Sequence, residues 1–339
     1  MSIAVVLQQM IMIFILIGIG LLLYKKELLS EITSKQISGI IVNVTNPALL
    51  ICSAFREGPK VSVSELGMAL GIYLVVYAIL IAVSFLIPRI LRVPNMYHYA
   101  YQMLTIFGNV AFIGIPLAST VLGTESLIFV SIYNLIFNIL IYTFGISLLQ
   151  RAEAKQSAAA AQNIKTVSPT ADTTSTAASD HPSLHDTNVV SSRWKKLINA
   201  GTISAAATII FYLGNFHVPA IVSSTLTYMG QATTLLSMLV LGTSVAQMTP
   251  KDIFSHPKLY GFALLRQILV PIGCILLLRP FIHNPLILNT MALMLAVPAA
   301  NMPLMLSKQL HVETDTIAQG IILTTILSLG TIPVVCLFL

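Results

Sequence analysis

The sequence predicts an all-α integral membrane protein with ten transmembrane helices, arranged as two inverted five-helix repeats whose broken fourth and ninth helices cross. Two observations predict the membrane class: 56% of the 339 residues are hydrophobic, and only 9% are charged, whereas a soluble domain carries about 25% charged residues. A third observation predicts the repeat: two apolar segments, one in each half of the chain, are interrupted near their middles, the first by glycine and proline and the second by proline.

Ten apolar segments approach the roughly 20 residues that a helix needs to cross a bilayer. The first has no basic leader and no evident cleavage site, so we expect a retained span rather than a signal peptide. The segments cover residues 4–24, 36–55, 66–88, 97–122, 126–149, 196–215, 219–248, 258–281, 285–308 and 315–338.

Residues 1–149 and 194–339 form the two predicted repeats, each with five spans. Because five is an odd number, the second repeat must lie upside down relative to the first. Pro116 and Pro303, at corresponding breaks, are 187 residues apart, and similarity at a fixed offset indicates duplication. Residues 150–193 are rich in Ala, Ser and Thr and carry scattered charge, a composition that predicts a flexible linker.

Lysine and arginine in the loops predict the orientation. If the N-terminus lies outside, the loops from odd- to even-numbered helices are cytoplasmic and hold fourteen basic residues, whereas the outer loops hold three. We therefore expect a multi-pass protein of the plasma or inner membrane, with both termini extracellular or periplasmic and residues 150–193 cytoplasmic. The net charge of +6 reflects this topology, and no nucleic-acid partner is predicted.

The fourth segment is broken within GNVAFIGIP at residues 108–116. Gly108 and Gly114 weaken a helix, and Pro116 lacks an amide donor and clashes with the preceding turn. In hydrocarbon, the backbone groups freed by such a break must face protein or a water-filled cavity. The break therefore predicts a lined cavity near the middle of the membrane.

The ninth segment repeats this arrangement in LAVPAANMP, with Pro298 and Pro303. Paired breaks in corresponding halves are typical of a secondary transporter's binding site. Asn109 and Asn301 lie beside the breaks, and each amide offers two donors without the cost of burying a charge. Half-helix N-termini carry about half a positive charge, which suits a carboxylate. We expect substrate to bind between the two asparagines; the alternative is that they only satisfy broken backbone.

A third kink is predicted in VNVTNPALL at residues 42–50, where Asn46 and Pro47 are expected to unwind the second span. Thr45 precedes this kink, and Thr233 lies 188 residues later in the seventh span. These polar groups either line the same cavity or hydrogen-bond between helices, at roughly 0.6 kcal/mol per contact in membranes.

Arg266 lies about two turns into the eighth span, within LLRQILVP. An arginine at a helix centre costs about 2.5–3.5 kcal/mol on insertion scales. Two interpretations follow. Either the side chain extends to the cytoplasmic surface, which relieves most of that cost, or it is a countercharge that attracts an organic anion into the cytoplasmic vestibule.

All twelve Asp and Glu residues fall in loops or near helix ends. A cation antiporter or proton pump normally needs a carboxylate inside the membrane, so an anionic or neutral substrate is favoured. The sequence has no GxSxG, HExxH, P-loop or CxxC motif, and its histidines lack metal-ligand spacing. It therefore predicts a gradient-driven transporter rather than an enzyme, with no metal and no cofactor.

Four of these motifs resemble the auxin efflux carrier family. GNVAFIGIP (108–116) and AVPAANMPLMLSKQ (296–309) resemble its fourth and ninth helices, and VNVTNPALL (42–50) and LLRQILVP (264–271) resemble its second and eighth. The resemblance covers essentially all ten spans. It implies a fold shared with sodium/proton antiporters and bile-acid carriers, in which helices 1, 2, 6 and 7 form a scaffold domain and helices 3–5 and 8–10 form a transport domain.

The resemblance further implies a bacterial-type member that moves small organic anions, such as malonate, malate or auxin-like acids, and that forms a homodimer through the scaffold. Carried onto matching positions, the crossover residues are Asn109, Pro116, Pro298 and Asn301. Two alternatives remain. One is a sodium-coupled symporter of the bile-acid carrier type, which needs a cage of carbonyl and hydroxyl oxygens near the crossover. The other is a channel or a non-transporting membrane receptor.

Overall fold

The computed structural model describes residues 3–55, 61–167, 200–214, 218–247, 256–310 and 312–339. Within these ranges the chain is helical, apart from connecting turns and one isolated β-bridge. Seven helices are long and apolar enough to cross a membrane, and three shorter apolar helices, Val110–Val121, Ala200–Gly214 and Pro285–Ala296, accompany them. The all-α membrane class is confirmed, and the count of ten membrane-crossing helices stays a prediction.

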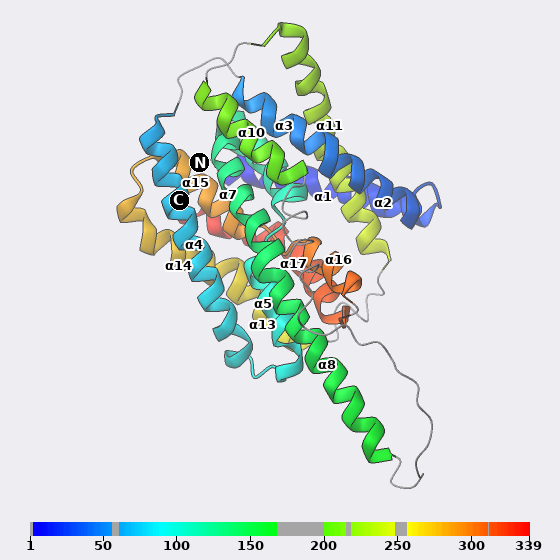
Figure 1. The fold of residues 1–339 in the computed structure, drawn as a ribbon. Helices are drawn as coiled ribbons and strands as arrows, with labels where there is room; N and C mark the ends of the chain where they lie inside the picture. Colours follow the sequence, from blue (N-terminus) through cyan, green and yellow to red (C-terminus); the bar gives the residue numbers. More distant parts are fainter. Residues whose placement is uncertain (1–2, 56–60, 168–199, 215–217, 248–255, 311) are drawn as a thin grey trace, which may run out of the picture.

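Helices follow one another along the first half of the chain with short connections (Figure 1). The elements η1, η3 and η5 are π-helical turns; η1 and η5 join α-helices end to end, and η3 leads directly into α6. The first half contains α1 (Ile3–Lys25), α2 (Glu31–Ile40), η1 (Ile41–Thr45), α3 (Asn46–Ala54), α4 (Val63–Ile90), α5 (His98–Ile106), η3 (Val110–Gly114), α6 (Ile115–Val121), α7 (Leu127–Leu140), η5 (Ile141–Gly145) and α8 (Ile146–Val167).

Among the described residues of the second half of the chain there is one π-helical turn of the same kind, η6. Its described helices are α10 (Ala200–Gly214), α11 (Ala220–Ala246), α13 (Pro257–Leu264), η6 (Leu265–Leu269), α14 (Val270–Leu278), α15 (Pro285–Ala296), α16 (Met302–Gln309) and α17 (Asp315–Cys336).

Side-chain caps determine where several helices begin. The Ser62 hydroxyl accepts the Glu65 N–H at 3.2 Å, and a Glu65 carboxylate oxygen accepts the Ser62 N–H at 3.0 Å, a capping box that starts α4. Asn284 starts α15, because its side-chain oxygen accepts the Leu286 N–H at 2.8 Å. The Asn284 amide also donates to the other Glu65 oxygen at 2.8 Å, so the first turns of α4 and α15 lie together.

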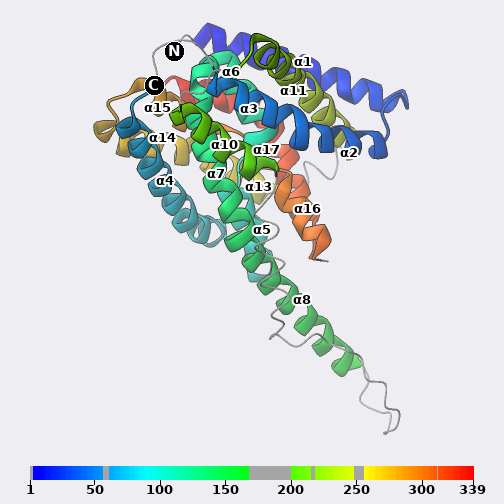
Figure 2. The ribbon, with the colours of Figure 1, turned by 45° about the horizontal axis from the view of Figure 1, so that its top comes forward.

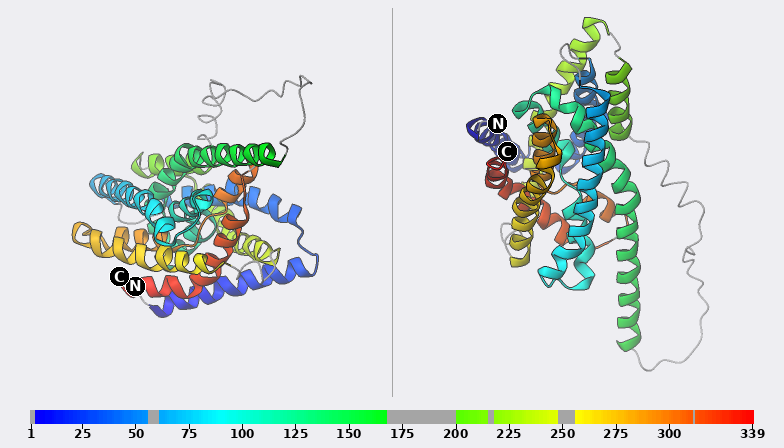
Figure 3. Two further views of the ribbon diagram at one scale, coloured as in Figure 1. Left: turned by 90° about the horizontal axis from the view of Figure 1, so that it is seen from below. Right: turned by 90° about the vertical axis from the view of Figure 1, so that its left-hand side faces the viewer.

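Two groups of helices pack extensively among themselves, and they also contact each other, because α10 packs against α7 and α1 packs against α17 (Figures 1 and 2). In one group, α1 packs along α11, and α11 and α10 both pack against α3. In the other, α4 packs against α5 and α7, and α17 packs against α5, α13 and α15. The start of α1 and the end of α17 lie close together (Figure 3). The division into a scaffold and a transport domain stays a prediction.

Three of the π-helical turns end two residues before a proline, at Pro47, Pro116 and Pro271. Proline donates no hydrogen bond and its ring clashes with the carbonyl four residues earlier, and a wider turn relieves the clash. The predicted unwinding at Asn46 and Pro47 is wrong, because the Asn46 N–H donates to the Ile41 carbonyl and the second span continues as one helix. The seventh span, α11, is also continuous.

Helix α8 continues beyond the other helices to Val167 (Figures 1 and 3). Residues 150–167 therefore form helix, although the sequence predicts flexible linker there. The stretch AKQSAAAAQ at 154–162 explains the difference, because alanine is the best helix former. The rest of the predicted linker, residues 168–193, lies outside the described residues.

Glycines allow α1 and α11 to approach closely. A Cβ atom on Gly242 would lie 2.1 Å from the Ile17 carbonyl oxygen, and one on Gly20 would lie 2.4 Å from the Leu239 carbonyl oxygen. Small residues commonly bring membrane helices into such backbone contact, where van der Waals packing replaces the missing hydrophobic driving force. The two glycines therefore set the distance between these helices.

Gly242→Ala should lower the unfolding temperature of the purified protein. The added methyl group meets backbone atoms, so α1 and α11 must separate, and overpacking of this kind costs about 1–3 kcal/mol. Gly18→Ala in α1 is the matched control, because its Cβ would meet no atom within 4 Å. Equal unfolding temperatures for the two variants in detergent would contradict the close approach.

Candidate functional site

The two predicted breaks meet inside the molecule. Residues 107–109 separate α5 from η3, and residues 297–301 separate α15 from α16. Gly108 and Ala299 form an antiparallel β-bridge. On either side of it, the Asn109 N–H donates to the Pro298 carbonyl at 2.7 Å, and the Ala300 N–H donates to the Phe107 carbonyl at 2.9 Å. Backbone groups freed by one break are thus hydrogen-bonded by the other, and the predicted crossing of the broken helices is confirmed. We call the place where residues 107–109 meet residues 297–301 the crossing.

Small residues make room for the crossing. A Cβ atom on Gly108 would lie 3.0 Å from Val297 Cγ2 and 3.2 Å from Arg266 Nη2. One on Gly114 would lie 3.1 Å from Met294 Sδ. Three predicted site residues, Pro116, Pro298 and Pro303, are buried around the crossing. These glycines and prolines therefore determine the shape of the crossing. Contacts to a ligand must come from polar side chains nearby.

Arg266 lies within the crossing and is 1% exposed. Its Nε donates to the Thr105 carbonyl at 2.7 Å, and its Nη1 donates to the Leu295 carbonyl. These carbonyls belong to the last turns of α5 and α15, which lack intrahelical donors and carry partial negative charge. The guanidinium thus caps two helix C-termini at once.

The position of Arg266 contradicts one of the two interpretations from the sequence, the one in which its side chain extends to the cytoplasmic surface. The side chain does not extend to the surface, because charge-assisted hydrogen bonds to two carbonyls replace the water that it would gain there. It is a countercharge to the α5 and α15 termini, and its predicted role in attracting an organic anion stays a prediction. Its Nη2 is buried and has no hydrogen-bond partner among the described residues.

The crossing carries net positive charge. Among the described residues, Arg266 is the only charged side chain that is buried, and no Asp or Glu joins it. The charge of Arg266 offsets the partial negative charge at the C-terminal ends of α5 and α15. The N-terminal ends of η3 and α16 carry partial positive charge, and no buried carboxylate of the described residues balances it. Such a site favours an anion.

Asn109 presents an unpartnered donor at the crossing. The residue is 2% exposed, and its side-chain oxygen caps η3 by accepting the Phe112 N–H at 3.2 Å. Its Nδ2 is buried and has no partner among the described residues. Leaving such a group unpaired costs about 1–3 kcal/mol, which a bound acceptor would recover. Asn301, at the start of α16, is partly exposed, and its carbonyl accepts the Met305 N–H at 3.1 Å.

Further polar groups lie on the helices that face the crossing from the α1–α11 side. The Asn46 amide donates to the Ala111 carbonyl in η3 at 3.0 Å, so the predicted interhelical hydrogen bond is present. The Asn46 side-chain oxygen and the Thr45 and Thr233 hydroxyls are buried without partners in the described part of the chain. Since α11 packs against both η1 and η3, these atoms lie along the boundary between the two helix groups.

Sequence reasoning missed several residues of the crossing. The Ala299 N–H donates to the Thr324 hydroxyl at 3.2 Å, and the Gln267 amide donates to the Thr324 carbonyl at 2.9 Å. Tyr77 and Tyr133 are buried near Arg266, with ring centroids 4.8 Å apart. Gln267 was detectable as a second polar residue in an apolar span. The tyrosines and Thr324 give no comparable indication, since such residues also occur in ordinary helix packing.

Comparison with known proteins identifies one family. A family model described as "Membrane transport protein" matches residues 5–336, which include both breaks and Arg266. A search of curated proteins finds no significant match. In the described part of the chain, no group of three or more His, Cys, Asp or Glu side chains is placed to hold a metal ion.

Proposed function

The chain belongs to the auxin efflux carrier family of membrane transport proteins, and we propose that it carries small organic anions across the membrane by alternating access. The substrates would be mono- or dicarboxylates, such as malonate or malate, or auxin-like acids. A multi-pass membrane protein follows from the family and the seven apolar helices. The observation that carries the substrate class is the unpartnered Nδ2 of Asn109 at a crossing whose buried charge is positive.

The chemistry of the crossing supports a carboxylate. A carboxylate accepts hydrogen bonds and donates none, which matches the free Asn109 donor. A hydrogen bond to a charged group contributes about 1.5–3 kcal/mol. The N-terminal ends of η3 and α16 add about 0.3–1 kcal/mol each, and up to about 2 kcal/mol in partly buried geometry. A cation would meet Arg266 with no buried carboxylate beside it in the described residues.

The packing supports alternating access as the mechanism. In our proposal α1, α2–α3, α10 and α11 form the scaffold, and the other helices carry the crossing. A carboxylate held by Asn109 would lie where η3 faces α3 and α11, at the boundary between the two groups. Movement of one group against the other would then expose it to each side in turn. A homodimer formed through the scaffold, outward termini and a cytoplasmic central segment belong to the same proposal.

Transport should be independent of sodium. A sodium symporter of the bile-acid carrier type needs free carbonyl oxygens near the crossing, but Arg266 already donates to those of Thr105 and Leu295. The guanidinium also places a positive charge beside these carbonyls, which would repel a sodium ion there. We expect equal carboxylate uptake into proteoliposomes in sodium and in choline buffers of matched pH. Uptake that requires sodium would instead favour the symporter.

Counterflow in proteoliposomes tests the proposed function. Vesicles loaded with one unlabelled acid at a time, from malonate, malate, succinate, lactate and indole acetate, are given the same labelled acid outside. We expect transient accumulation with at least one acid and none in protein-free vesicles. A channel would equilibrate label without accumulation, and a receptor would bind without flux. No exchange by folded protein with any of these acids would contradict the proposal.

A further inference from the structure

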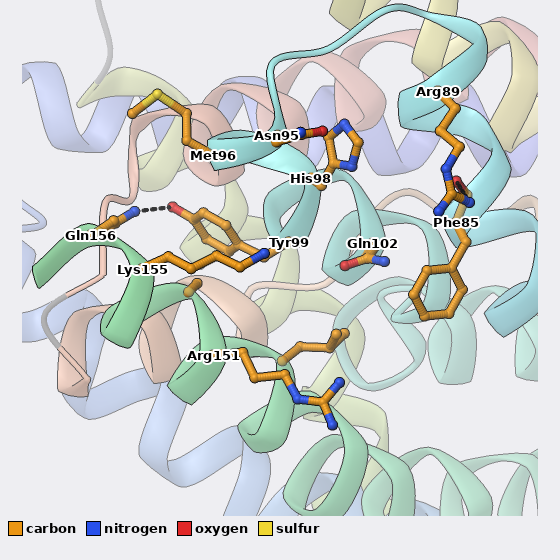
Figure 4. A pocket seen from close by; sticks show the side chains of 12 residues that line it. Phe85, Arg89, Asn95, Met96, His98, Tyr99, Gln102, Arg151, Lys155 and Gln156 are labelled. Atoms are coloured by element: carbon orange, nitrogen blue, oxygen red, sulfur yellow. Dashed lines mark hydrogen bonds between the residues drawn. The ribbon is translucent and has the colours of Figure 1, made fainter. Parts of the chain in front are cut away.

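A separate cavity of about 460 Å³ lies at the end of the molecule from which α8 projects (Figure 4). Its walls come from the last turns of α4, residues 95–96, the first turns of α5 and the first half of α8. It includes none of the residues of the crossing. A ligand in this cavity would therefore bind separately from the transported substrate.

Three cations surround this cavity. Arg89 comes from α4, and Arg151 and Lys155 come from α8, one helical turn apart. In Figure 4 Arg89 lies on one side of Gln102, and Arg151 and Lys155 lie on the other. No Asp or Glu lines the cavity, and none of these three cations forms an ion pair with a carboxylate of the described residues. The lining residues therefore carry net positive charge, and the carboxylate beside them, that of Glu313, lies outside the lining and accepts a hydrogen bond from Tyr99.

The floor of the cavity contains an unpartnered polar group. Gln102 is 7% exposed and lines the cavity, and its amide makes no hydrogen bond within the described residues. The amide can therefore donate to a ligand or to water in the cavity. Leu148 and Ala152 are buried beside it, and the apolar side chains of Phe85 and Met96 stand exposed at the edge.

A hydrogen-bond network joins the cavity wall to the second half of the chain. The Tyr99 hydroxyl lies 2.6 Å from the Glu313 carbonyl oxygen and 3.1 Å from a Glu313 carboxylate oxygen. The Gln156 amide donates to the Tyr99 hydroxyl at 3.3 Å, and its oxygen accepts the Glu313 N–H at 3.2 Å. Glu313 lies between α16 and α17, directly beyond the second broken helix. A ligand in the cavity would thus hold α8 against helices from both halves.

We propose that this cavity binds a phosphate-bearing anion, with Arg89, Arg151 and Lys155 around the phosphate and the Gln102 amide donating to it. Arginine forks match phosphate oxygens in bidentate geometry, and three cations suit a group of one or two negative charges. The phosphate could belong to the head group of an anionic lipid, since basic pockets between membrane helices bind such head groups, or to a soluble phosphate ester. The proposal does not depend on which anion the crossing transports.

Thermal unfolding in lipid nanodiscs tests this proposal and separates the two sources. The wild type is compared in phosphatidylcholine alone, in phosphatidylcholine with phosphatidylglycerol, and in phosphatidylcholine with soluble glycerol 3-phosphate. We expect the unfolding temperature to rise by a few degrees with phosphatidylglycerol, because a ligand that binds only the folded state stabilises it. A rise with glycerol 3-phosphate would assign the site to a soluble ester. No rise in either arm would overturn the proposal.

Matched double variants distinguish the cavity from general surface charge. R151Q/K155Q should lose at least half of the shift, and Gln102→Leu should reduce it, whereas K25Q/K26Q should keep the whole shift. The control pair removes the same charge from exposed positions at the end of α1, outside the cavity. An equal loss in K25Q/K26Q, or an unchanged shift in R151Q/K155Q, would overturn the proposal.

Discussion

Asn109→Asp should abolish carboxylate exchange while leaving the protein folded. Aspartate keeps an oxygen that can accept the Phe112 N–H and so preserves the cap of η3. It removes both donors of the amide and places a negative charge where the substrate carboxylate would lie. Loss of one charge-assisted hydrogen bond costs about 1.5–3 kcal/mol, or about 10- to 150-fold in affinity, before like-charge repulsion is added. Counterflow of the best acid measures the effect.

Two further variants at this position separate substrate binding from capping. Asn109→Ser keeps a capping oxygen and stays neutral, so we expect partial activity. Asn109→Ala loses both the cap and the donors, so we expect lost exchange together with a lower unfolding temperature. If folded Asn109→Asp protein exchanged carboxylates like the wild type, the Asn109 amide would not be the substrate contact.

Arg266→Gln should lower both stability and transport, with the largest effect on stability of the changes considered. The substitution removes the only buried charge of the described residues and leaves Thr105 and Leu295 with at most one short amide to share. Each buried carbonyl left unsatisfied costs about 1–3 kcal/mol. Unfolding temperature in detergent reports the stability, and counterflow reports transport. Arg279→Gln is the control, because Arg279 is exposed.

Chemical rescue tests whether the charge of Arg266 matters beyond its shape. In Arg266→Ala vesicles, free guanidinium ion should restore part of the exchange, whereas urea, which has a similar planar shape without charge, should not. Equal rescue by both compounds would indicate a packing role alone. Wild-type stability and exchange in Arg266→Gln would contradict its role as a cap of α5 and α15.

Much of the crossing could be predicted from sequence because glycine and proline act locally. Gly108 and Pro298 lie within the two breaks, beside Asn109 and Asn301, as the sequence predicts. Pro116 does not interrupt its helix, because η3 and α6 are continuous around it and the break lies at residues 107–109. The membrane class likewise follows from composition, which needs no knowledge of contacts. At Pro47 the sequence correctly indicates an irregular helix. It does not distinguish an unwound span from the wider π-helical turn that the structure contains.

Other features depend on contacts between distant segments, and the sequence could not provide them. The Arg266 side chain is long enough to reach either the surface or the crossing, and only the positions of Thr105 and Leu295 decide between the two. The unpartnered Gln102 becomes meaningful only once α4 and α8 enclose it. Residues 150–167 differ from the prediction for another reason. Their polar composition suggests a linker, but their alanine content favours the helix that the structure contains.

The most direct test of a carboxylate site at the crossing is a structure of the protein with its transported acid bound in a nanodisc. We expect a carboxylate oxygen within about 2.7–3.2 Å of Asn109 Nδ2, beside the N-terminal ends of η3 and α16. The same acid should be absent from this place in the Asn109→Asp protein. An acid bound elsewhere in the wild type, with Asn109 Nδ2 still unpartnered, would contradict the account.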